Sequence, residues 1–331
     1  MPNPAADLTQ KNADYYDKEA TTYALDPSKL HLARLISTTI LTSPSIPSPT
    51  FTESSTRILD FACGVGLLSQ CLTPHAKEIV GVDTSARSIE VYNRRVWEQG
   101  LEASDMRGVC ADLLSLGDEG EKPEQGVGKG SFDVVVCSMS YHHFHSISHA
   151  TQVLTSYLKP SGYLIVADIA RTPDTVRAFQ RNEDIKEVVS HVGGLEVEEV
   201  RRVMREAGLG GVVVEERLRF KIRVRGAGCK QTHGHSHGHE SGDGHSHGSG
   251  AGGHSHGDGH GHGHGHAHGH SHGKGGNHNG PHDGHGHKLE HKHEEKEKEA
   301  EAEEGRDEHP DVPGDKGGHP MSIFIAIGQK Q

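Results

Sequence analysis

One stretch constrains the fold of this chain more than any other: residues 58–72, which read ILDFACGVGLLSQCL. An apolar run ends in Asp60, and the small residues Ala62, Gly64 and Gly66 lead into the helix-like segment LLSQCL. This order predicts a buried parallel strand, a tight turn and the N-terminus of a helix. In an open α/β sheet such a turn lies at the carboxyl ends of the strands, where ligands bind. Glycines let a ligand approach the backbone closely, and the first-turn N–H groups are free to meet it.

The acid at the start of this turn narrows the kind of ligand. Asp60 disfavours a simple phosphate cradle, because a carboxylate there suits a positively charged partner. The segment DFACGVG resembles the first motif of the class I S-adenosylmethionine-dependent methyltransferases, D-x-G-x-G-x-G, with Ala62 in place of the first glycine. Their methyl donor carries an ammonium and a sulfonium group and no phosphate. The competing interpretation is a nicotinamide or flavin turn, G-x-G-x-x-G, in which a third glycine would replace Ser69.

Later segments resemble the same family in the same order, and the chain is similar to the group of methyltransferases that resemble the ubiquinone and menaquinone biosynthesis enzymes. It covers about residues 12–226 and 320–330. It implies transfer of a methyl group from S-adenosylmethionine to an unidentified acceptor, expected to be a small molecule. The segments that carry it, beside the first motif, are GVDTS, ADL, FDVVVCSMSYHH and LKPSGYLIVADI.

The resemblance also implies which residues bind the donor. Asp60 and the turn with Ala62, Gly64 and Gly66 would hold its methionine part. Ser138, at the end of the fourth expected strand, would also bind the donor.

The ribose and the adenine of the donor have their own expected partners. Asp83, followed by Thr84 at the tip of the second strand, would accept hydrogen bonds from both ribose hydroxyls, as an acid does there in either nucleotide family. The alternative is that Asp83 only caps the helix beginning near Ser85. In the family, Asp112 and Leu113 would hold the adenine; the alternative is that Asp112 merely opens a turn.

Two pairs of aromatic residues are expected near the reacting groups. His142 and His143 follow the fourth strand, and a histidine there would orient the acceptor or remove its proton, since its pKa lies near neutrality. They would otherwise only shape the pocket. The N-terminal segment YYDKEATTYAL resembles FD-x-x-A-x-x-Y, a helix that closes over the donor in relatives. Tyr16 and Tyr23 would then lie near the donor, unless they only pack a terminal helix onto the domain.

The pattern of the whole chain predicts a single α/β domain with a Rossmann-like sheet. We expect seven strands, the last of them antiparallel, with helices on both faces. Residues 1–226 and 320–331 form this domain, in which 1–50 are N-terminal cap helices and 170–193 a cap over the acceptor. The last two strands, GVVVEERLRFKIRVRG and MSIFIAIG, should form one hairpin.

Between these two strands lies a segment of a different kind, residues 227–319. Its 93 positions hold 23 of the 30 histidines, no aromatic residue, and no aliphatic residue larger than alanine except Leu289 and Val312. Such a segment buries no core, so we expect a disordered His/Gly-rich and acidic insertion. Its imidazoles would bind Zn²⁺, Ni²⁺ or Cu²⁺. Without fixed ligand spacing it predicts no structural metal site. It does leave open a second class of function, a metal-binding or metal-responsive protein on an inactive methyltransferase scaffold.

Charge and cysteine content exclude other classes. The net charge is −12 with neutral histidines, and the insertion contributes −8 of it from 8 basic and 16 acidic residues. Neither part has the basic footprint of a nucleic-acid-binding protein. Five scattered cysteines without a C-x-x-C pair favour a reducing compartment over a disulfide framework. No stretch reaches the roughly 18 apolar residues of a membrane span, and no signal peptide is recognisable, so we expect a cytoplasmic protein.

Overall fold

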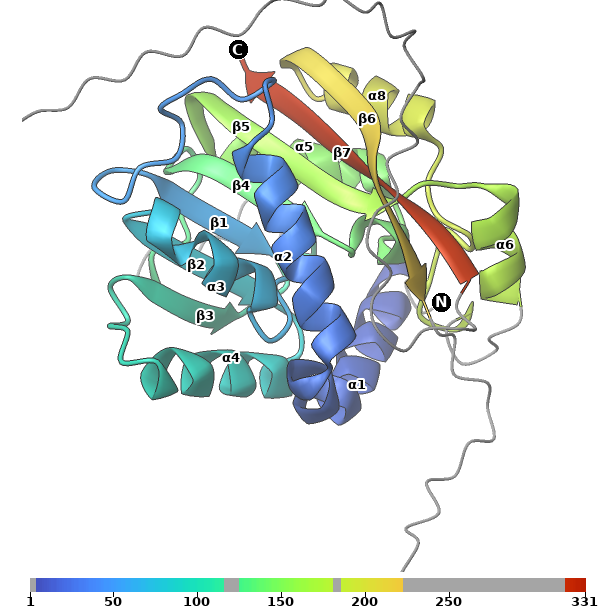
Figure 1. Cartoon of the computed structure of the whole chain (residues 1–331), viewed down its shortest axis with the longest axis horizontal. Helices are drawn as coiled ribbons and strands as arrows, with labels where there is room; N and C mark the ends of the chain where they lie inside the picture. Colours follow the sequence, from blue (N-terminus) through green and yellow to red (C-terminus); the bar gives the residue numbers. More distant parts are fainter. Residues whose placement is uncertain (1–3, 116–124, 181–185, 223–318) are drawn as a thin grey trace, which may run out of the picture. The chain divides into compact units, whose positions relative to one another are not determined.

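Seven strands form one mixed sheet in the part of the chain that the computed structural model describes, residues 4–115, 125–180, 186–222 and 319–331 (Figure 1). Their order across the sheet is β3-β2-β1-β4-β5-β7-β6, and only β7 runs antiparallel to its neighbours. This confirms the predicted sheet, including the antiparallel last strand. The strands are β1 (Arg57–Phe61), β2 (Glu78–Asp83), β3 (Met106–Cys110), β4 (Phe132–Ser138), β5 (Leu158–Ile169), β6 (Leu209–Ile222) and β7 (His319–Lys330).

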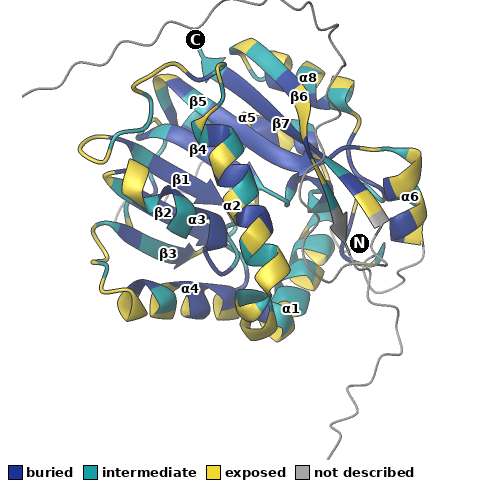
Figure 2. Cartoon of the chain, viewed as in Figure 1, coloured by how far each residue is buried: buried dark blue, intermediate teal, exposed yellow. Residues whose placement is uncertain are grey.

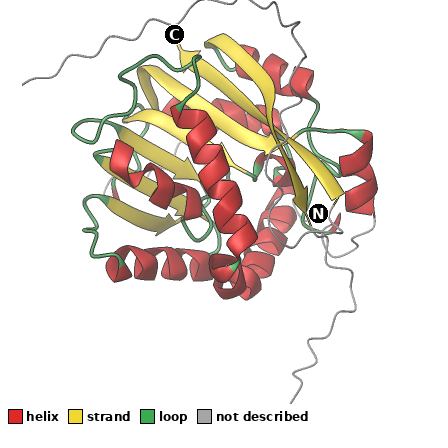
Figure 3. Cartoon of the chain, in the orientation of Figure 1, coloured by secondary structure: helices red, strands yellow, loops and turns green. Residues whose placement is uncertain are grey.

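Helices cover both faces of this sheet, as expected (Figure 3). Figure 1 shows α2 crossing in front of the strands and α5 behind them. The front face carries α2 (Pro27–Leu41), α3 (Leu67–Leu72) and α4 (Ala86–Glu98), and the back face α5 (Ile147–Tyr157) and α8 (Val197–Glu206). The remaining described helices are α1 (Pro4–Leu25), α6 (Pro173–Gln180) and the 3₁₀ turns η1 (Thr73–His75) and η4 (Tyr141–His143).

Burial on both faces explains why the central strands are apolar throughout. In β4 the run Val134 to Cys137 is fully buried (Figure 2). Successive side chains of a strand point to opposite faces. Val134 and Val136 accordingly pack with the α2, α3 and α4 side, while Val135 and Cys137 pack with α5 and α8.

Local capping residues set the helix starts that matter for the site. The Asp26 carboxylate accepts a hydrogen bond from the Ser28 N–H at 2.8 Å and starts α2, with Pro27 at the first position. The Ser85 hydroxyl accepts from the Ser88 N–H at 3.0 Å and starts α4. Helix α1 begins at Pro4. A proline tolerates this first turn, where its missing N–H would have no partner.

The two last strands pair along their whole length, from Leu209 opposite Lys330 to Ile222 opposite His319. The connection between them, residues 223–318, lies outside the described residues, and so does almost all of the predicted 227–319 insertion. Residues 181–185 of the predicted acceptor cap are also outside them. No helix in the described part of the chain is long and apolar enough to cross a membrane.

Candidate active site

The turn after β1 is shaped by left-handed backbone conformations. Ala62, Gly64 and Gly66 have φ angles of 54°, 53° and 79°. At Gly66 a Cβ atom would lie 2.5 Å from a ring carbon of Tyr92, so packing as well as conformation requires glycine. At Gly64 an added Cβ would meet no atom within 4 Å. The backbone at Gly64 is therefore accessible to a ligand, whereas Gly66 is packed against Tyr92.

Two carboxylates lie at the carboxyl ends of β1 and β2. Asp60 is 2% exposed and accepts a hydrogen bond from the Ser69 hydroxyl at 2.5 Å. Burial raises the pKa of Asp60 to about 7, and the nearby charge of Asp83 acts in the same direction. Burial also raises the pKa of Asp83. Near neutral pH Asp60 is therefore close to the midpoint of its ionisation, and a cation placed beside it would favour the charged form.

Asp83 holds the glycine turn as well as the start of α4. One carboxylate oxygen accepts from the Gly64 N–H at 2.8 Å, and the other accepts from the Ser85 N–H at 2.9 Å. The structure gives the cap of α4 to Ser85, so Asp83 does not cap this helix but supports the backbone ahead of it. Each oxygen keeps a second lone pair, so a ligand hydroxyl would still find an acceptor.

The residues after β3 show a similar double role. Asp112 accepts from the Leu114 N–H at 3.0 Å and the Ser115 N–H at 3.2 Å, so it does open a turn, and it also lines the cavity described below. Leu113 is 1% exposed and belongs to the core, whereas Leu114 lines the cavity. Leu114, and not the expected Leu113, therefore lies on the cavity wall beside Asp112. The turn at Asp112 rotates the chain so that Leu113 faces the core.

One cavity collects most of the residues singled out in the sequence. Gly66, Leu113 and His142 are not on its wall. Its charged wall residues are Asp60, Asp83, Asp112 and a single cation, Lys29. The expected residues that line it are Tyr16, Tyr23, Asp60, Ala62, Gly64, Asp83, Thr84, Asp112, Ser138 and His143.

The chemistry of this wall fits S-adenosylmethionine. Three carboxylates and one lysine lie on the described part of the wall, and the lysine Nζ lies 5.2 Å from the centre of the Tyr23 ring. None of the described wall residues is an arginine. Such a wall suits a ligand with positive groups and offers little to a pyrophosphate.

His143 and Tyr16 meet inside the cavity. The Tyr16 hydroxyl lies 3.2 Å from Nε2 of His143, and Nδ1 of His143 lies 2.7 Å from the Val188 carbonyl oxygen. A carbonyl only accepts, so Nδ1 carries the proton and Nε2 accepts from Tyr16. Burial, and next the neighbouring His142, lowers the pKa of His143 to about 3. His143 is therefore a neutral imidazole whose lone pair points to the Tyr16 hydroxyl.

His142 has a different environment from its neighbour. It is 5% exposed, and its Nδ1 lies 2.6 Å from a carboxylate oxygen of Asp168 at the end of β5. Burial alone would raise the pKa of Asp168, but the adjacent His142 and the hydrogen bonds outweigh it and hold that pKa below its ordinary value. Sequence reasoning missed Asp168. The available signal was its position, an acid at the tip of the fifth strand, as at the first and second.

Helix α1 is fixed over the site by a residue that the sequence did not single out. The Asp17 carboxylate accepts from the Ser85 hydroxyl at 2.6 Å and from the Arg87 N–H at 3.0 Å. An acid is favoured at this helix N-terminus, where N–H groups lack intrahelical partners. This contact brings the helix that carries Tyr16 and Tyr23 to the N-terminus of α4.

A third histidine, His191, reaches the same region from the cap. Its backbone N–H donates to the His142 carbonyl at 2.9 Å, while its buried Nε2 has no hydrogen-bond partner among the described residues. Two arginines of the predicted cap 170–193, Arg171 and Arg177, pair with Glu196 and Asp174. Among the described residues no group of three or more His, Cys, Asp or Glu side chains could hold a metal ion.

The fold and this cavity define an α/β enzyme that binds a nucleoside-bearing, cationic ligand. The model of a family described as Methyltransferase domain matches residues 28–214, more than half of the chain. An uncharacterized methyltransferase of Schizosaccharomyces pombe is 32% identical over 241 residues, which are 63% of this chain and 82% of that relative. The chain belongs to this methyltransferase family and is a class I S-adenosylmethionine-dependent methyltransferase. The nicotinamide interpretation is thereby set aside.

Two more distant similarities complete the comparison. A ubiquinone biosynthesis O-methyltransferase of Leptothrix cholodnii is 26% identical over 117 residues, which are 35% of this chain and 46% of that enzyme. The solved phosphoethanolamine N-methyltransferase 2 of Haemonchus contortus, in complex with S-adenosyl-L-methionine, has a TM-score of 0.47 and 19% identity. That similarity covers 65% of this chain and 47% of the other. Family membership does not depend on these two.

Proposed function

We propose that this methyltransferase acts on the hydroxyl group of a small, uncharged acceptor that enters beside Tyr16 and His143. The hydrogen bond between these two residues inside the cavity is the observation that carries the proposal. At this place the neutral Nε2 of His143 already accepts a hydrogen bond from a hydroxyl group. An acceptor hydroxyl that takes the place of the Tyr16 hydroxyl would donate to the same lone pair.

The charge of the wall supports an uncharged acceptor. Three acids and one lysine line the cavity, so an anionic acceptor would find little compensation and would be repelled by Asp60, Asp83 and Asp112. The related ubiquinone biosynthesis enzyme is named an O-methyltransferase, which also favours an oxygen nucleophile. Nothing in the comparisons favours the alternative of an inactive, metal-binding scaffold.

The donor would be held by the residues at the ends of the first three strands. Asp60 and the turn at Gly64 would bind its methionine part, Asp83 with Thr84 its ribose, and Asp112 with Leu114 its adenine. The donor supplies an already activated methyl group on its sulfonium. The main task of the protein is then to align the acceptor with this methyl group. Such alignment lowers the activation barrier by roughly 7–11 kcal/mol in favourable cases. Ser138 and Tyr23 complete the wall around it.

Donor binding is tested by Asp83→Ala. Removing the carboxylate deletes a charge-assisted acceptor and also frees the Gly64 N–H, so we expect S-adenosylmethionine affinity to fall by about 2–4 kcal/mol. Titration calorimetry measures this, with Glu98→Ala on the exposed side of α4 as the control. Unchanged affinity in a folded Asp83→Ala protein would contradict the assignment.

Methyl transfer is tested with radiolabelled donor and fractionated cell extract. We expect label to enter a small-molecule fraction that anion exchange does not retain at neutral pH, because the acceptor is uncharged. His143→Ala should keep donor affinity and lower the rate by up to roughly 10²-fold through lost orientation of the acceptor, because a pKa of about 3 makes His143 a weak proton acceptor. A decrease under about threefold would reduce His143 to shaping the pocket. Label only in protein or nucleic acid would refute the proposed acceptor class.

We further propose that the His-rich segment binds divalent transition metals and that the protein works in a reducing compartment such as the cytoplasm. The first rests on the density of histidines in residues 254–272, since neutral imidazole binds Zn²⁺, Ni²⁺ and Cu²⁺. The second rests on the cysteines: Cys63, Cys71, Cys110 and Cys137 are all free thiols in the described part of the chain.

A further inference from the structure

A buried carboxylate lies directly behind the two histidines of η4. Asp168 is 0% exposed and accepts three hydrogen bonds. One oxygen accepts from Nδ1 of His142 and from the Ile169 N–H, both at 2.6 Å, and the other accepts from the His142 backbone N–H at 3.2 Å. Asp168 therefore holds both the ring and the backbone of His142. An amide at this position, with one oxygen, could not satisfy all three donors in the same arrangement.

The His142 ring separates this carboxylate from His143. The two imidazole rings have centroids 4.2 Å apart and are tilted by 40°. The Phe179 ring of α6 meets His142 edge-on, with centroids 6.0 Å apart. Since Nδ1–H of His142 points to Asp168, its ring is fixed in one orientation, with the tilted ring of His143 against it. His142 itself is not part of the cavity wall.

The η4 turn also connects the sheet to the predicted cap 170–193 and to helix α1. Within two residues, the His142 carbonyl accepts from the His191 N–H at 2.9 Å and His143 donates to the Val188 carbonyl at 2.7 Å. His143 in addition contacts Tyr16 of α1. A shift of this turn would move Nε2 of His143 relative to the acceptor. Displacements of about 1 Å cost up to about 10²-fold in rate.

We propose that Asp168 and His142 are a positioning pair for the methyl acceptor. Asp168 fixes the tautomer of His142 and the backbone of η4, and the His142 ring fixes the plane of His143, which faces the acceptor. His142, considered in the sequence as a catalytic base, acts through its neighbour and does not touch the acceptor. This inference rests on the proposed function, because it assigns the acceptor to the Nε2 side of His143.

The test compares Asp168→Asn, His142→Gln and the double variant in the full-length chain. The probes are radiolabelled S-adenosylmethionine and the extract fraction that wild-type enzyme labels. We expect each single variant to lower the maximal rate about 10–100-fold, the usual effect of losing a partner behind a functional histidine. Donor affinity by calorimetry should stay within about twofold. The double variant should be no slower than the slower single variant, because the two residues act as a unit.

The matched control is Asp133→Asn, which removes a carboxylate that pairs with Lys159 at 2.8 Å near the start of β4. It should lower stability without lowering the maximal rate. Rate losses that add in the double variant, a loss expressed as weaker donor binding, or an equal loss in Asp133→Asn would overturn the inference. If Asp168→Asn does not fold, the rate and donor affinity of His142→Gln decide alone. No label uptake by the wild type would refute the proposed function itself, whereas wild-type uptake with unimpaired variants refutes only the positioning pair.

Discussion

At the scale of single residues, folding and donor binding make opposite demands on Asp60. Its carboxylate is buried, and burial raises its pKa to about 7, against about 3.9 in an unfolded chain. The folded protein thus binds this proton more tightly than the unfolded chain does. Stability from this residue is complete below pH 4 and is lost as the pH rises through 7. A bound cation beside Asp60 would reverse this loss.

We therefore expect Asp60→Asn to stabilise the donor-free protein at pH 8 by on the order of 2–4 kcal/mol and to have little effect at pH 4. An asparagine oxygen still accepts from the Ser69 hydroxyl. Urea unfolding at the two pH values measures the difference. The same variant should bind S-adenosylmethionine more weakly, and wild-type affinity should increase from pH 6 to pH 8 as Asp60 ionises. A stability difference between variant and wild type that does not change with pH would contradict this account.

The residues of the site were predictable from the sequence where position along a strand decides their place. Asp60, Asp83 and Asp112 follow strands whose ends meet at one edge, and all three line the cavity. Leu113 and Leu114 could not be told apart, because the turn that rotates them depends on side-chain hydrogen bonds of Asp112.

The departure from the first-motif pattern has a conformational basis. Ala62 stands where the motif D-x-G-x-G-x-G has a glycine, and its φ is positive, 54°. A glycine at this position would suit a left-handed backbone, which this chain adopts with an alanine at some cost in strain. Sequence alone shows the substitution but not that the backbone conformation is kept.

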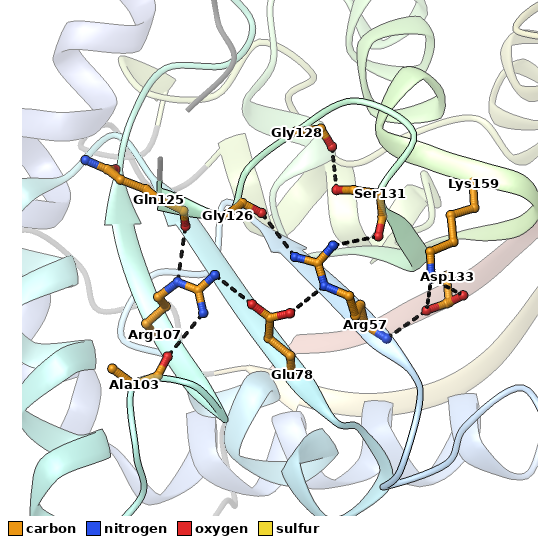
Figure 4. A network of polar contacts seen from close by, with 10 residues as sticks. All are labelled: Arg57, Glu78, Ala103, Arg107, Gln125, Gly126, Gly128, Ser131, Asp133 and Lys159. Atoms are coloured by element: carbon orange, nitrogen blue, oxygen red, sulfur yellow. Dashed lines mark hydrogen bonds and ion pairs between the residues drawn. The ribbon is translucent and has the colours of Figure 1, made fainter. Parts of the chain in front are cut away.

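At the scale of elements, the opposite edge of the sheet is held by a different polar network (Figure 4). Glu78 at the start of β2 lies between two arginines, Arg57 of β1 and Arg107 of β3, and its contact with Arg107 is 2.7 Å. The arginines also donate to backbone carbonyls, among them Ser131 at 2.9 Å and Ala103 at 3.1 Å. Figure 4 shows these side chains converging on Glu78 from neighbouring strands. The network joins three strands at their amino ends, away from the cavity.

Glu78→Gln should lower the free energy of unfolding by about 1–2 kcal/mol, because two partly buried guanidinium groups lose their shared countercharge. Burial acts to raise the pKa of Glu78, but the two arginines outweigh this effect and hold the pKa below its ordinary value. The stabilisation is therefore present above the unfolded pKa of about 4.3 and is lost as the pH falls below it. Urea unfolding at pH 7 and pH 3 checks this, with Glu198→Gln, an exposed partner of Arg201, as the control. A decrease in donor affinity in Glu78→Gln would show that the network at the amino ends of the strands and the cavity at their carboxyl ends are not independent.

Elements were predicted better than contacts, for a physical reason. Strands and helices follow from apolar periodicity, which the sequence contains directly, and β1 to β7 lie where those patterns predict them. Contacts between elements far apart in the sequence have no local signal. Asp17 contacts Ser85 and His143 contacts Val188 across 68 and 45 positions. Asp17 is one of several acids in α1, and only the docking of the helix distinguishes it.

At the scale of the whole molecule, the chain combines a packed methyltransferase domain with a His-rich segment that interrupts its last hairpin. We expect replacement of residues 230–317 by a short Gly/Ser linker to leave thermal stability and donor affinity within experimental scatter. The segment offers almost no apolar side chain to a core. The hairpin is already paired up to Ile222 and His319. Shortening a loop also reduces the closure entropy, by only about 0.6 kcal/mol for each halving of length.

The shortened protein should lose its retention on immobilised nickel, because only eight histidines remain and none are clustered beyond His142, His143, His145 and His149. The matched control keeps the segment's length and charge but replaces its histidines by serine. It should behave like the shortened protein on nickel and like the wild type in donor binding. Calorimetry with and without Zn²⁺ completes the test. Unfolding of the shortened protein would show that the segment supports the domain, and a donor affinity that depends on Zn²⁺ in the intact chain would show that metal regulates the methyltransferase.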